Sequence, residues 1–140
     1  MNSSPTRPNA IITGAGSGIG RATSLAFARA GINIALVGRS LKSLEDVAKE
    51  SAKEGIKVKP YVIDLDQLDM VSIQIQKIVS DFNGIDIIVN NAGMGYTNLL
   101  RETSLSDCES VLDLYLTIFF QCVQGVLHYI RKHMKGTIVN

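Results

Sequence analysis

The sequence has little of what stabilises small secreted proteins or anchors proteins in membranes. It contains no tryptophan, two cysteines and three prolines in 140 residues, and only 6% of its residues are aromatic. Cys108 and Cys122 show no Cys-x-x-Cys or histidine pairing pattern, which predicts buried free thiols rather than a disulfide or a metal site. The chain has no run of eighteen apolar residues and no apolar stretch in residues 1–8. We therefore expect no transmembrane helix, no signal peptide and a cytoplasmic location.

An excess of charge of either sign is also missing. The chain has fourteen Lys and Arg residues and thirteen Asp and Glu residues, so its net charge is +1. This balance argues against a nucleic-acid-binding surface or an acidic tail. Hydrophobic residues make up 46% of the chain and charged residues 19%, as in a globular protein that buries one core. We expect a flexible polar arm over residues 1–8 and one domain over residues 9–140.

Short apolar runs and helical spacings alternate along the chain. The expected strands are 9–13, 33–37, 57–63, 85–89 and an unfinished one at 137–140. The expected helices are 18–30, 41–52 (capped by Ser40), 68–82 and a long one from Ser106 or Asp107 to about His133. This alternation predicts an α/β fold, a Rossmann-like doubly wound parallel sheet of about five strands. Ligands of such sheets bind beyond the carboxyl ends of the strands.

A glycine cluster follows the first expected strand directly. The residues from Thr13 to Gly20 read T-G-x-x-x-G-x-G, which is not the G-x-G-x-x-G spacing of many dinucleotide sites. Glycines permit a sharp turn and close approach of a phosphate, and the free amides of the following helix attract anions. The alternative interpretation is a tight strand-to-helix turn without a ligand.

Three motifs in this order resemble the short-chain dehydrogenase/reductase family. They are the Thr13–Gly20 turn, Asp64 after the third strand, and Asn90-Asn91-Ala92-Gly93 after the fourth. The resemblance runs from about residue 9 to the last residue and implies an NAD(P)-binding Rossmann domain. The cofactor-binding residues that it implies are Gly14, Gly16, Ser17, Gly18, Ile19, Gly20, Gly38, Arg39, Ser40, Asp64, Leu65, Asn90, Ala92 and Gly93.

The resemblance also implies a role for each group. The glycine turn would wrap the pyrophosphate, Asp64 and the Leu65 backbone would line the adenine pocket, and the Asn90–Gly93 turn would flank the ribose beside the nicotinamide. Two alternatives stay open. Asp64, or Asp66 in its place, could cap the helix that starts near Gln67, and Asn90 could tie neighbouring strands together.

The end of the second strand bears on the choice of cofactor. Folds that select NAD place an acid there to bind the ribose 2′-hydroxyl, but this chain has Gly38-Arg39-Ser40 and no acid before Glu45. A guanidinium can hold a 2′-phosphate in a bidentate manner, and Ser40 could add a hydroxyl. We therefore expect NADP(H) in preference to NAD(H). The alternative is that Arg39 is simply a solvated residue.

The catalytic residues of the family cannot be assigned in this chain. By resemblance, the catalytic serine follows an I-V-N segment like Ile138-Val139-Asn140, and a Tyr-x-x-x-Lys motif lies further on, so both would come after Asn140. Tyr115 occupies a position where the family commonly has asparagine. Tyr61, Tyr96 and Tyr129 have no lysine four positions later. The resemblance implies that these residues are the cofactor-binding half of an oxidoreductase that interconverts a carbonyl and an alcohol by hydride transfer. We expect no catalysis by the 140 residues alone.

The long helix is apolar on more than one face. One face would cover the sheet, and the other predicts a homo-oligomer through residues 107–133, as related proteins form. Burial under further segments of its own chain is the rival interpretation.

His128 and His133 have no acidic partner in register, so no metal site is expected. Two other hypotheses remain: a non-catalytic nucleotide-binding or protein-interaction module derived from the family, and a non-functional fragment. Tyr96 and the loop to Arg101 could border a substrate pocket.

Overall fold

The structure is a computed structural model that describes residues 7–93 and 99–140. Its centre is a five-stranded parallel sheet in the order β3-β2-β1-β4-β5. The strands are β1 (Asn9–Thr13), β2 (Asn33–Gly38), β3 (Val58–Val62), β4 (Ile87–Val89) and β5 (Thr137–Val139). The chain runs outward from β1 to β3 and then crosses back to β4 on the other side of β1. The predicted Rossmann-like fold is confirmed, and the switch point between β1 and β4 is where such sheets bind ligands.

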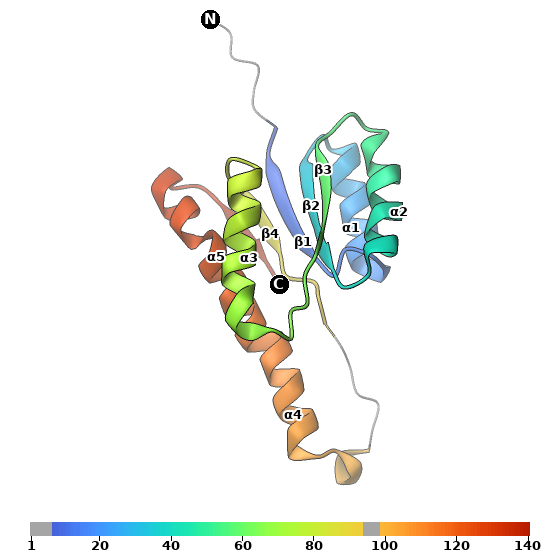
Figure 1. Cartoon of the computed structure of the whole chain (residues 1–140), viewed down its shortest axis with the longest axis vertical. Coiled ribbons are helices and arrows are strands. Elements are labelled where there is room, and N and C mark those ends of the chain that lie inside the picture. Colours follow the sequence, from blue (N-terminus) through green and yellow to red (C-terminus); the bar gives the residue numbers. More distant parts are fainter. Residues whose placement is uncertain (1–6, 94–98) are drawn as a thin grey trace, which may run out of the picture.

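Helices cover both faces of this sheet (Figure 1). The helices α1 (Gly18–Arg29) and α2 (Leu41–Ala52) lie on one face, and α3 (Leu68–Asp81) and α5 (Ile118–His133) lie on the other. One core, with Ile12, Leu36 and Leu44, fills the space under α1 and α2. A second core, with Ile75 and Cys122, fills the space under α3 and α5. Because the central strands are covered on both sides, β1 and β2 read as continuous apolar runs.

The element boundaries follow local chemistry closely. Gly31 and Gly55 adopt φ angles of +76° and +67° just after α1 and α2, where an L side chain would be strained. The Ser40 hydroxyl caps α2 by accepting from the Ser43 backbone N–H at 3.3 Å, as predicted. A side chain at Gly125 would meet Ile75 at 2.6 Å, so this glycine lets α5 pack directly on α3. Because all the strand pairs are parallel, the carboxyl ends of the strands lie at one edge of the sheet.

The predicted start of the long helix is wrong by one or two residues. The helix α4 (Leu105–Leu112) begins after Ser104, whose hydroxyl accepts from the Asp107 N–H at 3.1 Å. The Asp107 carboxylate accepts in return from the Ser104 N–H at 3.0 Å, which completes a capping box. The Ser104 hydroxyl, at 2.7 Å, and this N–H together hold the pKa of Asp107 below its usual range. Asp107 is therefore the third residue of the helix and not its cap.

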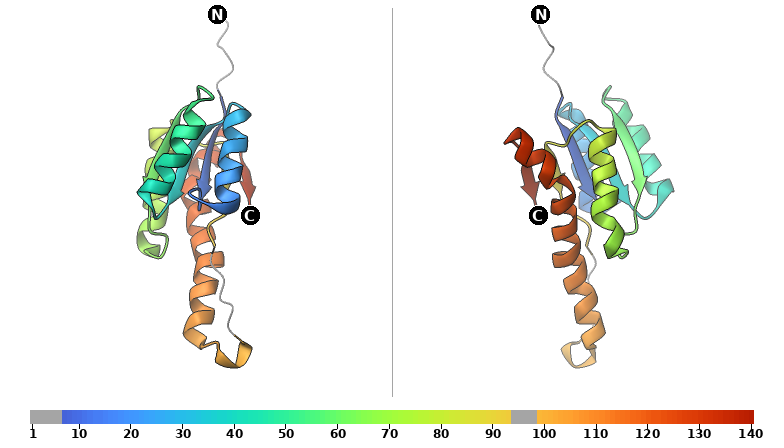
Figure 2. Two further views of the ribbon diagram at one scale, coloured as in Figure 1. Left: turned by 90° about the vertical axis from the view of Figure 1, so that its right-hand side faces the viewer. Right: turned by 60° about the vertical axis from the view of Figure 1, so that its left-hand side comes forward.

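The long helix is also not one regular α-helix. A π-helical turn, Asp113–Thr117, joins α4 to α5, and α4 extends beyond the carboxyl edge of the sheet together with the one-turn helix Leu100–Glu102 (Figures 1 and 2). Because α4 lies beyond the core, Cys108 is exposed, and the prediction that both thiols are buried is wrong for this residue. Cys122 is buried, as predicted, and both thiols are free in the structure.

Two regions of the chain bear on other predictions. Residues 1–6 of the predicted arm lie outside the described residues. Arg7 and Pro8 make hydrogen bonds to the domain: Arg7 donates to the Gly55 carbonyl, and the Pro8 carbonyl accepts from the Asn33 N–H.

The helical stretch Leu105–His133 contains an 18-residue window with a mean hydropathy of 1.5. By length and composition, this stretch is long and apolar enough to cross a membrane. Only 24% of this window is buried within the described chain. The absence of a membrane partner therefore stays a prediction.

Candidate functional site

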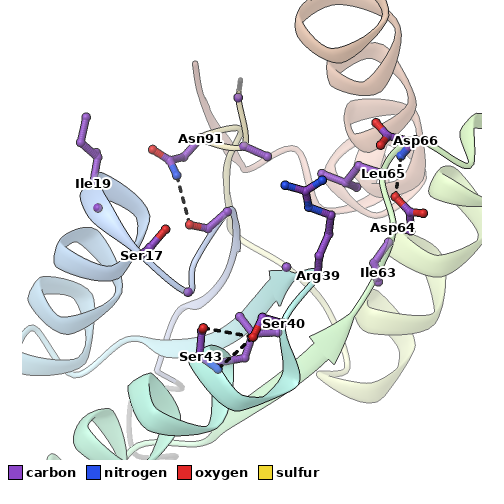
Figure 3. Close-up of a pocket in the computed structure, with 17 residues that line it drawn as sticks. Ser17, Ile19, Arg39, Ser40, Ser43, Ile63, Asp64, Leu65, Asp66 and Asn91 are labelled. Carbon is purple, nitrogen blue, oxygen red and sulfur yellow. Dashed lines mark hydrogen bonds between the residues drawn. The ribbon is translucent and has the colours of Figure 1, made fainter. Parts of the chain in front are cut away.

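A cavity of about 580 Å³ lies at the carboxyl edge of the sheet. Its lining comes from the loops after β1, β2, β3 and β4, which are distant in sequence. Twelve of the fourteen predicted cofactor residues line it: Gly14, Gly16, Ser17, Gly18, Ile19, Gly38, Arg39, Ser40, Asp64, Leu65, Ala92 and Gly93. The volume is in the range of ordinary ligand pockets. The structure thus gathers the three sequence motifs around one cavity (Figure 3).

The glycine turn forms one wall of the cavity. Gly14 and Gly18 adopt φ angles of +66° and +51°, which favour glycine. In the described part of the chain, no atom beyond the adjoining backbone lies within 4 Å of the position that a Gly18 Cβ would take. The residue before α1, Ser17, is extended and makes no side-chain cap, so its hydroxyl does not occupy the first amides of the helix. The turn therefore presents open space at a helix N-terminus, as an anion-binding turn requires.

The glycine turn and the turn after β4 are joined by Thr13. Its buried hydroxyl accepts from the backbone N–H groups of Asn91 and Ala92, both at 3.0 Å, and donates to the Val89 carbonyl at 3.3 Å. The Asn91 side-chain amide donates to the Thr13 carbonyl at 3.1 Å. These bonds fix the two loops on either side of the switch point relative to one another.

Arg39 and Ser40 lie at the end of β2, as predicted. Figure 3 shows Arg39 between the glycine turn and the Asp64–Asp66 segment, with Ser40 and Ser43 beside it. The Ser40 oxygen accepts from both the backbone N–H of Ser43 and the Ser43 hydroxyl, at 3.3 and 3.1 Å. Since both of its lone pairs are used, the Ser40 hydroxyl keeps only its own hydrogen to offer a ligand.

Asp64 does not cap α3. Its carboxylate accepts from the backbone N–H of Asp66 at 3.1 Å, which forms a local turn, while the residue before α3 is Gln67 without a side-chain cap. Neither carboxylate takes the capping role that the sequence left open. Asp64, Leu65 and Asp66 all line the cavity on the side opposite the glycine turn.

Two predicted residues do not line the cavity. Gly20 is buried, and a Cβ there would meet the Gly14 carbonyl oxygen at 2.1 Å, so this glycine lets the first turn of α1 close against the loop. Asn90 donates from its side chain to the Asn140 side chain at 3.0 Å and from its backbone to the Val139 carbonyl at 2.9 Å. The interpretation of Asn90 as a tie between neighbouring strands is confirmed, while a ligand role for it stays a prediction.

Sequence reasoning missed five lining residues. They are Ser43, Leu44, Ile63, Asp66 and Asn91. Asn91 and Ser43 could have been predicted to line the cavity. Asn91 belongs to the Asn90–Gly93 motif, and Ser43 stands three residues after the helix cap Ser40. Leu44 and Ile63 read as ordinary core residues, and only their packing brings them to the cavity.

A second cavity, of about 750 Å³, lies at the opposite edge of the sheet between α3 and α5. Its lining includes His128, Tyr129 and Lys132, and none of the predicted cofactor residues contributes to it. Among residues 7–93 and 99–140, no three His, Cys, Asp or Glu residues are arranged to hold a metal ion. Tyr96 falls outside the described residues, so its predicted place beside a substrate pocket is untested.

Comparison with known proteins defines the class to which this fold and cavity belong. Residues 8–140 match the family model described as "short chain dehydrogenase". The 3-oxoacyl-[acyl-carrier-protein] reductase FabG of Thermotoga maritima is 36% identical over 130 residues, which are 93% of this chain and 53% of that protein. FabG of Chlamydia muridarum is 35% identical over 141 residues, 100% of this chain and 57% of that protein.

Solved structures give the same result. An alcohol dehydrogenase from Thermococcus sibiricus complexed with 5-hydroxy-NADP superposes with a TM-score of 0.88 at 30% identity, over 96% of this chain and 57% of that one. NAD+-bound xylitol dehydrogenase also has a TM-score of 0.88 at 30% identity, over 95% and 52% of the two chains. The chain belongs to the short-chain dehydrogenase family, and it spans about half the length of the curated relatives it matches.

Proposed function

We propose that this chain is the cofactor-binding half of an NADP(H)-dependent oxidoreductase that interconverts a carbonyl and an alcohol. The observation that carries the proposal is the common lining of one cavity by the glycine turn, by Arg39 with Ser40, and by the Ala92–Gly93 turn. Relatives in the family include an enzyme complexed with an NADP derivative and an NAD+-bound enzyme, so family membership alone leaves the choice between the two cofactors open.

Preference for the phosphorylated cofactor rests on residues of this chain. Arg39 supplies a guanidinium to the cavity lining. The Ser40 oxygen already accepts two hydrogen bonds, so the Ser40 hydroxyl can interact with a ligand only as a donor. Both groups favour a phosphate over a neutral hydroxyl. The carboxylates on the lining, Asp64 and Asp66, follow β3 and lie across the cavity from the glycine turn, so β2 ends without a group that would repel a 2′-phosphate.

The bound nicotinamide would supply the hydride, and the chain's own residues would bind and orient the cofactor. The glycine turn would receive the pyrophosphate, Asp64 and Leu65 the adenine, and Ala92 and Gly93 the ribose beside the nicotinamide. The 140 residues contain no Tyr-x-x-x-Lys motif for proton transfer to a carbonyl. We therefore propose that they bind the cofactor but do not catalyse carbonyl reduction.

An exposed apolar face supports association as a further property. Leu116, Phe120 and Leu127 are 61%, 62% and 41% exposed and lie at spacings of four and seven residues along the π-helical turn and α5. We propose that this face forms a homo-oligomer contact, and a protein-interaction module is the alternative function that the same observation favours.

The proposal is tested by titrating the purified chain with NADP+, NADPH and NAD+ in a calorimeter. The expected result is saturable binding of the two phosphorylated forms, at least about tenfold tighter than NAD+, which corresponds to one charge-assisted contact. Equal affinities would remove the NADP preference, and no binding of any of the three would contradict the cofactor role. In the same sample, measurable NADPH-dependent carbonyl reduction would contradict the proposal that the 140 residues alone do not catalyse.

A further inference from the structure

Tyr115 lies against the turn after β4. It comes from the π-helical turn Asp113–Thr117, and its phenolic oxygen is 2.7 Å from the position that a Cβ on residue 93 would take. Two ring carbons follow at 3.1 and 3.2 Å. The ring therefore occupies the space beside Gly93 that a side chain would otherwise fill.

The backbone does not explain why residue 93 is glycine. Gly14 and Gly18 have positive φ angles, but Gly93 does not, so an L side chain at position 93 would meet no conformational penalty. Among the described residues, the three atoms nearest to a Cβ at position 93 all belong to the Tyr115 ring. The Tyr115 ring thus packs directly against Gly93, across two distant parts of the chain.

This pair completes the support of the turn. Thr13 holds the turn from the β1 side through the N–H groups of Asn91 and Ala92, and these bonds stop one residue before Gly93. Tyr115 contacts the turn at Gly93, where the Thr13 bonds do not reach. Gly93 lines the cavity, so any shift of the Gly93 backbone changes the lining on that side.

We propose that Tyr115 is a positioning residue for the nicotinamide half of the cofactor, acting through Gly93. This inference rests on the proposed function, which puts the nicotinamide ribose beside Ala92 and Gly93. Arg39 and the glycine turn lie on other parts of the cavity lining than Gly93. Removal of the Tyr115 ring should therefore weaken binding of the nicotinamide half and leave binding of the adenosine half unchanged.

The test compares two ligands by calorimetry, NADP+ and 2′,5′-ADP, which lacks the nicotinamide half. In Tyr115→Ala, affinity for NADP+ should fall roughly tenfold, the scale of one lost aromatic contact, while affinity for 2′,5′-ADP stays within about twofold. Tyr115→Phe keeps the ring beside Gly93 and should retain more of the affinity for NADP+ than Tyr115→Ala does. Tyr129→Ala makes the same change on α5, beside the second cavity, and should leave both affinities unchanged.

A double substitution separates positioning from general damage. Gly93→Ala should displace the Tyr115 ring and weaken NADP+ binding, and the added Tyr115→Ala should restore part of the loss because it removes the clash. An equal loss for both ligands in Tyr115→Ala would mean a structural role only, and no loss for either would mean that Tyr115 is not needed; each contradicts the inference. If the unaltered chain binds 2′,5′-ADP but Tyr115→Ala behaves normally, the inference fails while the cofactor role stands. If the unaltered chain binds neither ligand, the proposed function fails and the inference with it.

Discussion

The Thr13 hydroxyl accepts a hydrogen bond of 3.0 Å from the backbone N–H of Asn91, across 78 positions of sequence. The same oxygen accepts a second bond from Ala92, and its residue is only 2% exposed. One threonine thus ties the glycine turn of β1 to the turn of β4. Residues of both turns line the cavity at the carboxyl edge of the sheet.

We predict that Thr13→Val destabilises the domain by about 2 kcal/mol, because two partly buried N–H groups lose their acceptor while the side-chain volume is kept. Urea unfolding followed by circular dichroism measures the change. Thr137→Val, at an exposed position in β5, is the control and should change the free energy of unfolding by less than about 0.5 kcal/mol. Equal effects of the two substitutions would mean that the Thr13 bonds do not hold the loops.

Gly18→Val should abolish cofactor binding. The side chain would enter the open space before α1, and the positive φ would add about 1–2 kcal/mol of strain. Gly55→Val is a matched control, because Gly55 also has a positive φ and open space around its Cβ position but lies away from the cavity. Both variants should lose similar stability in thermal melts, while Gly55→Val keeps its affinity for NADP+. Unimpaired binding by Gly18→Val would contradict the anion-binding role of the turn.

Arg39→Asp should reverse the preference between cofactors. The new carboxylate repels a 2′-phosphate and can accept from a ribose 2′-hydroxyl, so affinity for NADP+ should fall at least about tenfold while that for NAD+ rises. Arg29→Asp makes the same change of charge at an exposed site outside the cavity and controls for long-range electrostatics. If relative affinities measured by calorimetry are the same in Arg39→Asp and the unaltered chain, Arg39 does not contact the cofactor.

The two thiols should differ in reactivity. Burial raises the pKa of Cys122 to about 12, so the thiolate that reacts is scarce in the folded state, whereas Cys108 is exposed. At about pH 8, Ellman's reagent should titrate one thiol in the native chain and two in urea. Because the folded pKa of Cys122 is raised, its contribution to stability is present below the unfolded value of about 8.5 and is lost as the pH rises above it. Rapid reaction of both thiols in the native chain would place Cys122 outside the core.

Phe120→Glu should weaken self-association. A charge at the centre of the exposed apolar face opposes its burial, and Ile73→Glu on α3 introduces the same charge at a similarly exposed apolar position, 56% against 62%. Sedimentation velocity over a range of concentrations should show a larger species for the unaltered chain and for Ile73→Glu, and a smaller one for Phe120→Glu. A monomer in all three would contradict the proposed contact.

Much of the fold followed from sequence because the decisive signals are local. Continuous apolar runs predicted buried parallel strands, and β1 was predicted with its observed bounds, Asn9–Thr13. The helix start at Ser104 was missed because Asp107 belongs to the same capping box and carries as strong a capping signal. Exposure of Cys108 could not be predicted either, since an apolar helix gives no sign of where the core beneath it ends.

The residues of the candidate site also fall into those that the sequence could predict and those that it could not. Motif residues such as Gly18 and Arg39 could be predicted to lie around one cavity because their chemistry is visible in the sequence. The support provided by Thr13 and Tyr115 could not, because it depends on contacts between segments that only the folded chain brings together. Gly20 shows the limit of motif reading, since it belongs to the glycine motif but serves packing against Gly14.

The most direct test of the central claim is an amide chemical-shift map of the ¹⁵N-labelled chain titrated with NADP+. We predict shifts at the glycine turn, at Arg39 and Ser40, at Asp64 and Leu65, and at Ala92 and Gly93, which together surround one cavity (Figure 3). Amides beside the second cavity, such as those of His128 and Lys132, should not move. Shifts confined to that second group, or no shifts at saturating NADP+, would contradict the claim that the cavity at the carboxyl edge of the sheet is a nicotinamide-cofactor site.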